Sequence, residues 1–519
     1  MERNWTRWPE GYLTGITLIA AALMLAAPLW SVWAPAMPDY PAHLASFALI
    51  EQGTGNRFYH LHWDFVPNLA SEVLVPWLAR LTGLVVAAKL FLTAAIFLWV
   101  LGPGAVHRAL YGRTGIAPLF GSFFAYNANF IWGFFNYYFS EGLSFAVFAG
   151  WIATQKSNGV ARIAGFTLAV TLLYFCHIFA AASLLLMLAG FETAQNFRLE
   201  NRDHKALARR AASVALIYIP AALAFLFLKP HAEGDNAVTF NFAGTMLDRF
   251  DSLVQHAFDD SATVLPIALF AGLGLALYRH KARLHPAMWG TLALLLLGAI
   301  FAPEWAFGGW AVHLRLPAVF GAMLFAAAEL PMTPPARSSL VGVVLVVISW
   351  CAITLAQSWL VYDRQVREFQ AALEEVPRGA RMLSVLDGDA IGDRPDQPYW
   401  HMAEFAVPER GNFTPLLFTT KGQHVVQLNP SYEKYAAASA EQGSPPDVDE
   451  LEALAQGRLT ADENIQDMTY LDHFQCHFDI AVVVHLDGKR TPLPPMLHLR
   501  HAGTFFSFYD IVPDRSCQQ

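Results

Sequence analysis

Charged residues are scarce in this chain of 519 residues. Asp, Glu, Lys and Arg make up 15% of it, whereas 55% is hydrophobic and the mean hydropathy is +0.35. Soluble domains carry about a quarter charged residues, so this composition excludes an ordinary soluble enzyme. It also excludes intrinsic disorder, which requires low hydrophobicity. No segment forms a basic nucleic-acid-binding platform, and we expect no nucleic-acid partner.

The motifs of several large enzyme classes are also missing. The sequence has no phosphate-binding loop, no dinucleotide-binding glycine fingerprint, no kinase motif set, no Gly-x-Ser-x-Gly elbow and no Cys-x-x-Cys pair. Nucleotide-driven transport and redox chemistry with a soluble cofactor are therefore unsupported.

The charges that are present divide the chain into two parts. Residues 363–519 hold 13 Lys and Arg against 24 Asp and Glu, a net charge of −11, whereas residues 1–362 hold 21 against 18, a net charge of +3. This asymmetry predicts a membrane domain over 1–362 and a water-exposed acidic domain over 363–519.

Long apolar stretches in the first part predict a polytopic α-helical membrane protein. A helix needs about 20 apolar residues to cross a bilayer, and the stretch 13–33 has 21 residues without a charge. Arg3 and Arg7 precede it, which predicts a cytoplasmic N-terminus because basic flanks favour the inner side. Further spans are expected near 83–104, 116–133, 138–155, 211–229, 263–279, 287–302, 310–329 and 339–360.

The basic segments between spans should all face the cytoplasm, and two regions fit this rule only as irregular structures. Segment 34–82 is expected to stay outside as a first loop with interfacial helices, because another crossing there would place Arg108 and Arg113 outside. The stretch 162–192 lies between two basic segments, so we expect two short helices that meet outside near His177. The count is then eleven spans, with the C-terminal tail on the outer side.

The acidic tail has the pattern of a small α/β domain outside the membrane. Helices are expected over 364–375 and 399–407, and strands over 382–386, 478–485 and 504–512. The stretch 439–467, rich in Glu, Asp, Gly and Pro, is expected to be an exposed insertion. Cys476 precedes the first late strand and Cys517 follows the second, so antiparallel pairing would allow a disulfide in an oxidising compartment. Two free thiols are the alternative.

Ionisable groups at membrane depth are costly and are hypotheses for function, and the densest group follows the first span. The segment 38–44 (PDYPAHL) carries Asp39 and His43 four residues apart. A helix beginning at Pro41 would leave both side chains on one side at the membrane surface. The alternative is that Asp39 only caps this helix ahead of the proline.

Further polar residues converge on the same outer face by topology. They are Glu141 in the turn at 136–141, His177 at the hairpin tip, and His313 and Arg315 just inside the tenth span. Taken singly, a loop histidine is solvated and an arginine near a helix end extends to the interface. Together they predict one outer cavity with an acid, several histidines and a cation. His60, His62 and Asp64 in the first loop could bind a divalent metal, although their spacing is a weak signal.

This layout resembles the membrane glycosyltransferases of the GT-C fold, which include protein O-mannosyltransferases, lipid A aminoarabinose transferases and oligosaccharyltransferases. It also resembles a group of bacterial membrane proteins with a first-loop Asp-x-Pro-x-His-Leu pattern, here DYPAHL at 39–44. The match continues at 136–137 (NY), at His177 in the hairpin, at 313–315 (HLR) and at 377–381 (PRGAR).

The resemblance implies a sugar donor carried on a polyprenyl phosphate. It makes Asp39 the catalytic acid or base of the first loop, and it makes Arg315, together with His313, a contact of the lipid phosphate. His43 and His177 would then line the pocket.

The chain departs from the family pattern at the second acid. Many members have paired acids in the first loop, whereas Tyr40 follows Asp39 here. The second acid could be Glu51, Asp64 or Glu141, or it could be absent, which leaves activity itself open.

These observations favour a glycosyltransferase on the outer face of a bacterial inner membrane, with a polyprenyl-phosphate-linked sugar as donor and an envelope glycan or lipid as acceptor. One alternative is a non-catalytic transporter or assembly component of envelope polysaccharide synthesis. Transporters usually show internal repeats and charged or broken helices at the bilayer midplane; the sequence shows no repeat. Another alternative is a degenerate family member that only binds lipid-linked sugar.

Overall fold

A computed structural model describes most of the chain. The described residues are 10–53, 55–157, 159–197, 204–228, 238–255, 264–307, 309–388, 398–436, 445–456, 458, 470–486, 490–513 and 517.

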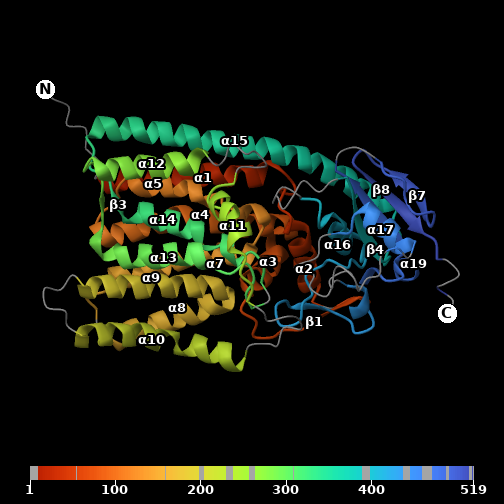
Figure 1. Cartoon of the computed structure of the whole chain (residues 1–519), viewed down its shortest axis with the longest axis horizontal. Coiled ribbons are helices and arrows are strands. Elements are labelled where there is room, and N and C mark those ends of the chain that lie inside the picture. The colour runs from red at the N-terminus through yellow and green to blue at the C-terminus, as the bar shows by residue number, and fades with distance from the viewer. Residues whose placement is uncertain are drawn as a thin grey trace.

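Roughly parallel helices form an elongated bundle, and a mixed α/β tail covers one end of it (Figure 1). The bundle helices are α1 (Glu10–Ser31), α4 (Leu84–Tyr111), α7 (Phe135–Ala153), α8 (Val160–Cys176), α9 (Ile178–Phe197), α10 (His204–Phe227), α12 (Val264–Tyr278), α13 (Trp289–Phe301), α14 (Leu316–Ala327) and α15 (Pro334–Ala372). By length and composition, five helices of the described residues could cross a membrane, namely those over Leu13–Ser31, Leu84–Tyr111, Ile178–Asn196, His204–Phe227 and Pro334–Glu375. The predicted polytopic helical architecture is confirmed, while the count of eleven spans stays a prediction.

The predicted span over 116–133 is wrong as a single helix. The chain forms α5 (Ala117–Gly121), the 3-10 turn η1 (Ser122–Ala125) and α6 (Ala128–Trp132) instead. The break occurs because the Asn127 side chain accepts a hydrogen bond from the amide of Asn129 and so starts a new helix. Gly133, at φ 88°, ends α6 immediately afterwards.

The predicted helical hairpin is present, with its turn at His177. Extended backbone at this residue, with φ −167° and ψ 128°, ends α8, and α9 begins one residue later. The two helices have 17 and 20 residues and are therefore longer than the 14 or so that an even division of the 29 residues between Arg162 and Glu192 provides.

The first loop contains two helices and connects the bundle to the tail. They are α2 (Tyr40–Gln52) and α3 (Ala70–Thr82), and the short strand β1 (Tyr59–Leu61) lies between them. β1 pairs antiparallel with β5 (Val426–Leu428) of the tail. Tyr40 and Leu44 of α2 pack into the core of the bundle, whereas Ala45 and Leu49 pack into a second core shared with the tail. The loop, the bundle and the tail are therefore packed together.

The tail is built on a four-stranded sheet with the order β4-β6-β8-β7. β4 (Met382–Asp387) runs parallel to β6 (Ile480–His485), and β8 (Phe506–Ile511) runs antiparallel to both β6 and β7 (Leu497–Ala502). The three predicted strands are confirmed. The predicted disulfide is also present, since Cys476 and Cys517 are bonded with their Cα atoms 5.3 Å apart.

The helix predicted over 364–375 is present as part of a longer helix, and the insertion predicted over 439–467 needs correction. The helix expected over 364–375 is the end of α15, which has 39 residues and runs without a break across the predicted domain boundary at 362. Within the stretch 439–467, expected to be an exposed insertion, α17 (Val448–Ala455) packs Val448 and Leu451 into the tail core. Residues 439–444, 457 and 459–467 lie outside the described part.

The remaining described elements are short connections. They are α11 (Phe242–Asp251), β2 (Arg283–Leu284), η3 (Pro286–Met288), η4 (Val312–Leu314), β3 (Ala328–Glu329), η5 (Leu373–Glu375), η6 (Met402–Phe405), α16 (Ala406–Arg410), η7 (Glu433–Tyr435) and α19 (Phe474–His477). The helix predicted over 399–407 corresponds to η6 and the start of α16.

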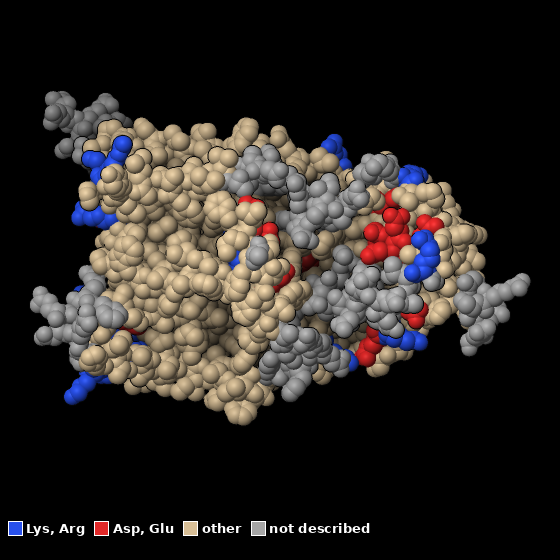
Figure 2. All heavy atoms as spheres, in the orientation of Figure 1, with Lys and Arg blue, Asp and Glu red and all other residues tan. Residues whose placement is uncertain are grey.

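The distribution of charge matches a membrane protein. Figure 2 shows Lys and Arg at the end of the bundle away from the tail, a broad uncharged belt along the helices, and mixed acidic and basic side chains on the tail. An uncharged belt between two polar ends is the surface that a bilayer requires.

Candidate functional site

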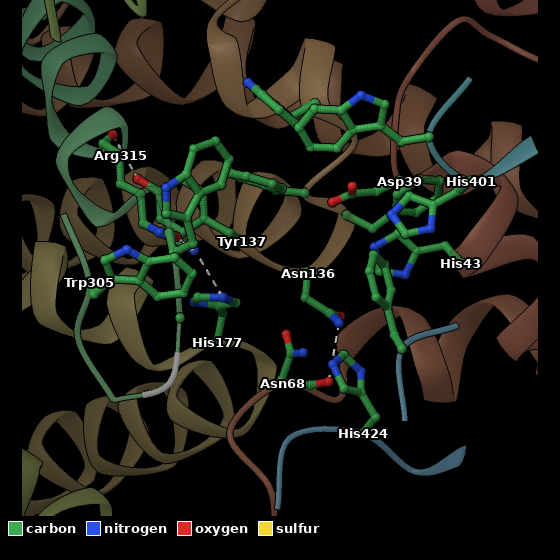
Figure 3. A pocket seen from close by; sticks show the side chains of 17 residues that line it. Asp39, His43, Asn68, Asn136, Tyr137, His177, Trp305, Arg315, His401 and His424 are labelled. Atoms are coloured by element: carbon green, nitrogen blue, oxygen red, sulfur yellow. Dashed lines mark hydrogen bonds between the residues drawn. The ribbon is translucent and has the colours of Figure 1, made fainter. Parts of the chain in front are cut away.

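A cavity of about 200 Å³ lies where the bundle, the first loop and the tail meet (Figure 3). Four of the predicted site residues line it, namely Asp39, His43, His177 and Arg315. Its other walls are Asn68, Trp132, Phe134, Phe135, Asn136, Tyr137, Trp305, Gly309, Trp310, Trp400, His401, Phe418 and His424. The cavity therefore combines distant segments of the sequence, including part of the tail.

Asp39 occupies the position before α2, but its carboxylate does not cap the helix. The residue has αR backbone angles, φ −83° and ψ −8°, and its side chain accepts no hydrogen bond from the first helical amides. Its backbone is held instead, because its amide donates to the carbonyl of Trp132 at 3.1 Å. The structure thus disfavours the capping interpretation and leaves the carboxylate at the cavity wall.

The close approach of Asp39 to α6 explains the glycine at 133. A Cβ atom on Gly133 would lie 3.3 Å from the Cβ of Met37 and 3.4 Å from that of Asp39, and its φ of 88° is strained for other residues. The glycine turn that ends α6 therefore also places Asp39.

Three histidines surround the end of the cavity where Asp39 lies, the acid end, and they share one aromatic neighbour. The rings of His43, His401 and His424 lie 5.2, 5.1 and 5.5 Å from the ring of Phe418. Figure 3 shows His43 and His401 beside Asp39, with His424 below them. All three histidines are buried.

Burial affects the protonation of His43 and His401 in opposite ways. Burial, together with the smaller effects of the charges of His424 and His401, lowers the pKa of His43 to about 3, so the His43 ring is neutral. Burial also opposes protonation of His401, but its interaction with Glu404 and the nearby Asp39 carboxylate outweigh burial and raise its pKa.

Glu404 is the acid that the sequence did not reveal. Its side chain is completely buried, and among the residues that the structure describes neither carboxylate oxygen has a hydrogen-bond partner. The nearest opposite charge is His401, whose Nδ1 lies 3.6 Å from Glu404 Oε1. A buried carboxylate needs a compensating charge, so Glu404 favours the protonated form of His401. Through His401, Glu404 acts on the Asp39 end of the cavity.

Arg315 provides the cation at the other end. Its guanidinium donates to the Trp310 carbonyl at 3.1 Å and lies 3.3 Å from His177 Nε2. It is also 4.8 Å from the ring centre of Tyr137 and 4.7 Å from that of Phe179. These contacts fix the plane of a buried guanidinium, which can bind phosphate oxygens through two parallel N–H groups.

Tryptophans line the space between the two ends. Trp132 lies 5.0 Å from Trp310 and 5.7 Å from Trp400, measured between ring centres, and Trp305 lies 6.4 Å from Trp310. These four rings come from α6, from the segment before η4 and from the tail. Flat indole faces suit the apolar C–H face of a sugar ring, while their N–H groups can bond hydroxyls.

Two predicted site residues lie away from the cavity wall. Glu141 on α7 is completely buried and accepts a hydrogen bond from Ser144 Oγ at 2.9 Å. His313 in η4 is also buried, and its Nδ1 has no hydrogen-bond partner within the described part of the chain. Neither residue is among those lining the cavity, so the structure does not bring them together with Asp39.

The remaining predicted acids do not supply a second cavity carboxylate. Glu51 and Asp64 are not among the lining residues. Glu72 of α3 is closer, because its Oε2 accepts a hydrogen bond from Asn136, a lining residue, at 2.7 Å. Burial raises the pKa of Glu72, although its hydrogen bond to Asn136 opposes this effect.

The metal hypothesis for the first loop receives no support from the geometry. Among the described residues, no group of three or more His, Cys, Asp and Glu side chains is arranged to hold a metal ion. His60 lies in β1 opposite Gln427, and the Asp64 carboxylate accepts a hydrogen bond from the amide of Phe65. His60, His62 and Asp64 therefore do not form a three-ligand group.

Several solved structures are similar to this chain, although similar sequences were not found. No protein-family model and no curated protein matches the chain. The chain is similar to the crystal structure of ArnT from Cupriavidus metallidurans bound to undecaprenyl phosphate, with 12% sequence identity and a TM-score of 0.46 over 97% of this chain and 99% of that one. It is also similar to ArnT from the same organism in the apo state, with 12% identity and a TM-score of 0.47 over 97% and 98%.

Proposed function

We propose that this protein is a membrane glycosyltransferase. It moves a sugar from a polyprenyl-phosphate donor to an envelope glycan or lipid on the outer face of the bacterial inner membrane. The observation that carries the proposal is one buried cavity with a fixed cation, Arg315, at one end and a carboxylate, Asp39, at the other. The chemistry of sugar transfer from a lipid phosphate needs both groups.

The donor phosphate belongs at the Arg315 end. Negative charge develops on the phosphate oxygen as its bond to the anomeric carbon breaks, and a preorganised guanidinium offsets that charge. The ring contacts of Arg315 keep its guanidinium in place before the donor arrives. The sugar then lies against the tryptophan wall formed by Trp132, Trp310 and Trp400.

The acceptor hydroxyl belongs at the Asp39 end. Asp39 takes the hydroxyl proton while the acceptor oxygen forms a bond to the anomeric carbon. The bond from that carbon to the phosphate oxygen breaks, and its electron pair leaves with the polyprenyl phosphate. Glu404 and Asp39 both favour the protonated form of His401, and in that form His401 places a positive charge next to the Asp39 carboxylate before the reaction.

A transfer assay with Asp39→Asn tests the proposal. Purified full-length protein is given polyprenyl-phosphate sugars together with envelope glycans and lipids as acceptors, and the release of free polyprenyl phosphate is measured. Turnover by Asp39→Asn should fall by about 10²-fold or more, because the amide cannot accept the proton. Donor binding and folding should change little, since the Asp39 side chain does not cap α2.

The matched control is Asp64→Asn, which changes another first-loop acid that does not line the cavity. The control should keep the wild-type rate. An Asp39→Asn rate equal to wild type would refute the assignment of Asp39. Donor binding by the wild type without any release of polyprenyl phosphate would instead identify a lipid-linked-sugar binder.

A further inference from the structure

A second cavity lies at the end of the bundle away from the tail. It has a volume of about 730 Å³ and is formed by the end of α7, the start of α8, the last turns of α9 and the start of α10. These helix ends meet at the left of Figure 1, far from the tail, and Figure 2 shows Lys and Arg side chains on that end of the molecule. This cavity is therefore separate from the proposed donor site.

The walls of the second cavity carry an excess of positive charge. Four basic side chains, those of Lys156, Arg162, Arg209 and Arg210, line it together with one acid, Glu192. Glu192 already accepts hydrogen bonds from Arg210 at 2.6 Å and from Trp151 Nε1 at 2.7 Å. The net positive charge of the lining residues favours an anionic ligand.

The guanidinium of Arg162 is fixed at the wall of this cavity. Its guanidinium lies 3.8 Å from the ring centre of Trp151, and it donates to Thr154 Oγ1 at 3.1 Å and to the Trp151 carbonyl at 3.2 Å. A stacked guanidinium loses less conformational freedom when it binds an anion. The cavity is therefore partly preorganised rather than a set of independent surface charges.

The flanks of the cavity are apolar and continue along the helices. Ile163 of α8 and Ala212 of α10 belong to its lining. Farther along the same two helices, Leu168, Leu172 and Leu216 are 61%, 55% and 50% exposed. Such side chains match acyl chains, whereas a soluble anion would gain nothing from them.

We propose that this cavity binds the phosphate headgroup of an anionic phospholipid from the leaflet at this end of the bundle. The headgroup phosphate contacts Arg162 and Lys156, and the acyl chains run along α8 and α10. Basic pockets between membrane helices bind anionic headgroups by this combination of charge and apolar surface.

The test is lipid binding to the purified full-length protein, measured by native mass spectrometry. The probes are phosphatidylglycerol, phosphatidylcholine and inorganic phosphate. Phosphatidylglycerol should bind the wild type more tightly than phosphatidylcholine. Each cation near a membrane surface contributes about 1 kcal/mol to the binding free energy of an anionic lipid. Lys156→Gln should therefore weaken binding about fivefold, and Lys156→Gln/Arg162→Gln about 30-fold. Lys156→Gln leaves the stacking of Arg162 on Trp151 intact, so it measures charge without disturbing the fold.

The matched control is Arg279→Gln/Lys281→Gln, which removes two exposed cations from the loop after α12, outside the cavity. The control should bind phosphatidylglycerol like the wild type. An equal loss in the control would overturn the proposal in favour of diffuse surface attraction. A second result would also overturn the proposal. If millimolar inorganic phosphate displaced phosphatidylglycerol completely, and the two lipids then bound equally, the cavity would be a site for soluble phosphate.

Discussion

Replacing Glu404 by glutamine tests how the tail controls the acid end of the donor cavity. Glu404 is completely buried, and its Oε1 lies 3.6 Å from His401 Nδ1. Without the carboxylate, burial becomes the main influence on His401. The pKa of His401 should then fall from its raised position, because desolvation disfavours the charged imidazole.

The loss of stability caused by Glu404→Gln depends on pH, and the direction of this dependence follows from the pKa of His401. The pKa of His401 in the folded protein is raised above its unfolded value of about 6.5. Protonated His401 therefore contributes stability that is fully present below that unfolded value and is lost as the pH rises through the folded pKa. Glu404→Gln removes the partner of this buried charge, which costs about 3 kcal/mol at about pH 5. The difference in the free energy of unfolding between Glu404→Gln and wild type should become smaller at higher pH, where His401 is neutral in both proteins.

Thermal unfolding of the detergent-solubilised protein across this pH range measures the difference. Glu374→Gln, which removes an exposed carboxylate of the tail, is the control and should match the wild type at every pH. The double variant His401→Asn/Glu404→Gln should be more stable at low pH than Glu404→Gln alone, since it has no buried cation to compensate. A stability loss that is constant across the range, or that grows with pH, would show that Glu404 contributes packing only.

Three further predictions concern other parts of the molecule. Arg315→Gln should raise the KM for the lipid-phosphate donor by about 10- to 100-fold, which corresponds to the free energy of a hydrogen bond to a charged group. Arg283→Gln at the far end of the bundle is the control, and an unchanged KM for Arg315→Gln would contradict a phosphate role. Ser507→Ala should lower the free energy of unfolding by about 1–3 kcal/mol, because Ser507 Oγ lies 3.1 Å from the buried Nε2 of His485; calorimetry that shows wild-type stability would disprove this. A reporter fused after Gln519 should report the outer compartment and one inserted at Arg283 the cytoplasm, and a cytoplasmic signal from the first would reverse the proposed orientation.

Patterns that depend on local sequence predicted the fold well. The strands at 382–387, 480–485 and 506–511 were visible because their β-branched and aromatic side chains form an apolar run. The strand Leu497–Ala502 was missed because it lies at the sheet edge and most of its side chains are exposed. The break within 116–133 was missed because hydropathy averages over a window, although Asn127 and Gly133 both carry the local signals of a helix start and a helix end.

The acid end of the cavity could be predicted only in part. Asp39 and His43 lie four residues apart, so their proximity follows from one helix. His401, Glu404 and His424 reach the same cavity only through the packing of the tail on α2, which no local pattern encodes. One signal was available: His401 and Glu404 lie three residues apart in a largely apolar segment, where an acid is expected to have a partner.

The position of α2 explains why the tail belongs to the site. All residues from Tyr40 to Ile50 are buried, because one face of the helix packs on the bundle and the other on the tail. A helix buried on both sides cannot shift without disturbing both cores. Asp39, at its first turn, therefore takes its position from the tail as well as from the bundle. Removing the tail would expose α2, take away His401 and Glu404, and change the charge beside the Asp39 carboxylate, so the catalytic unit we propose is the whole chain.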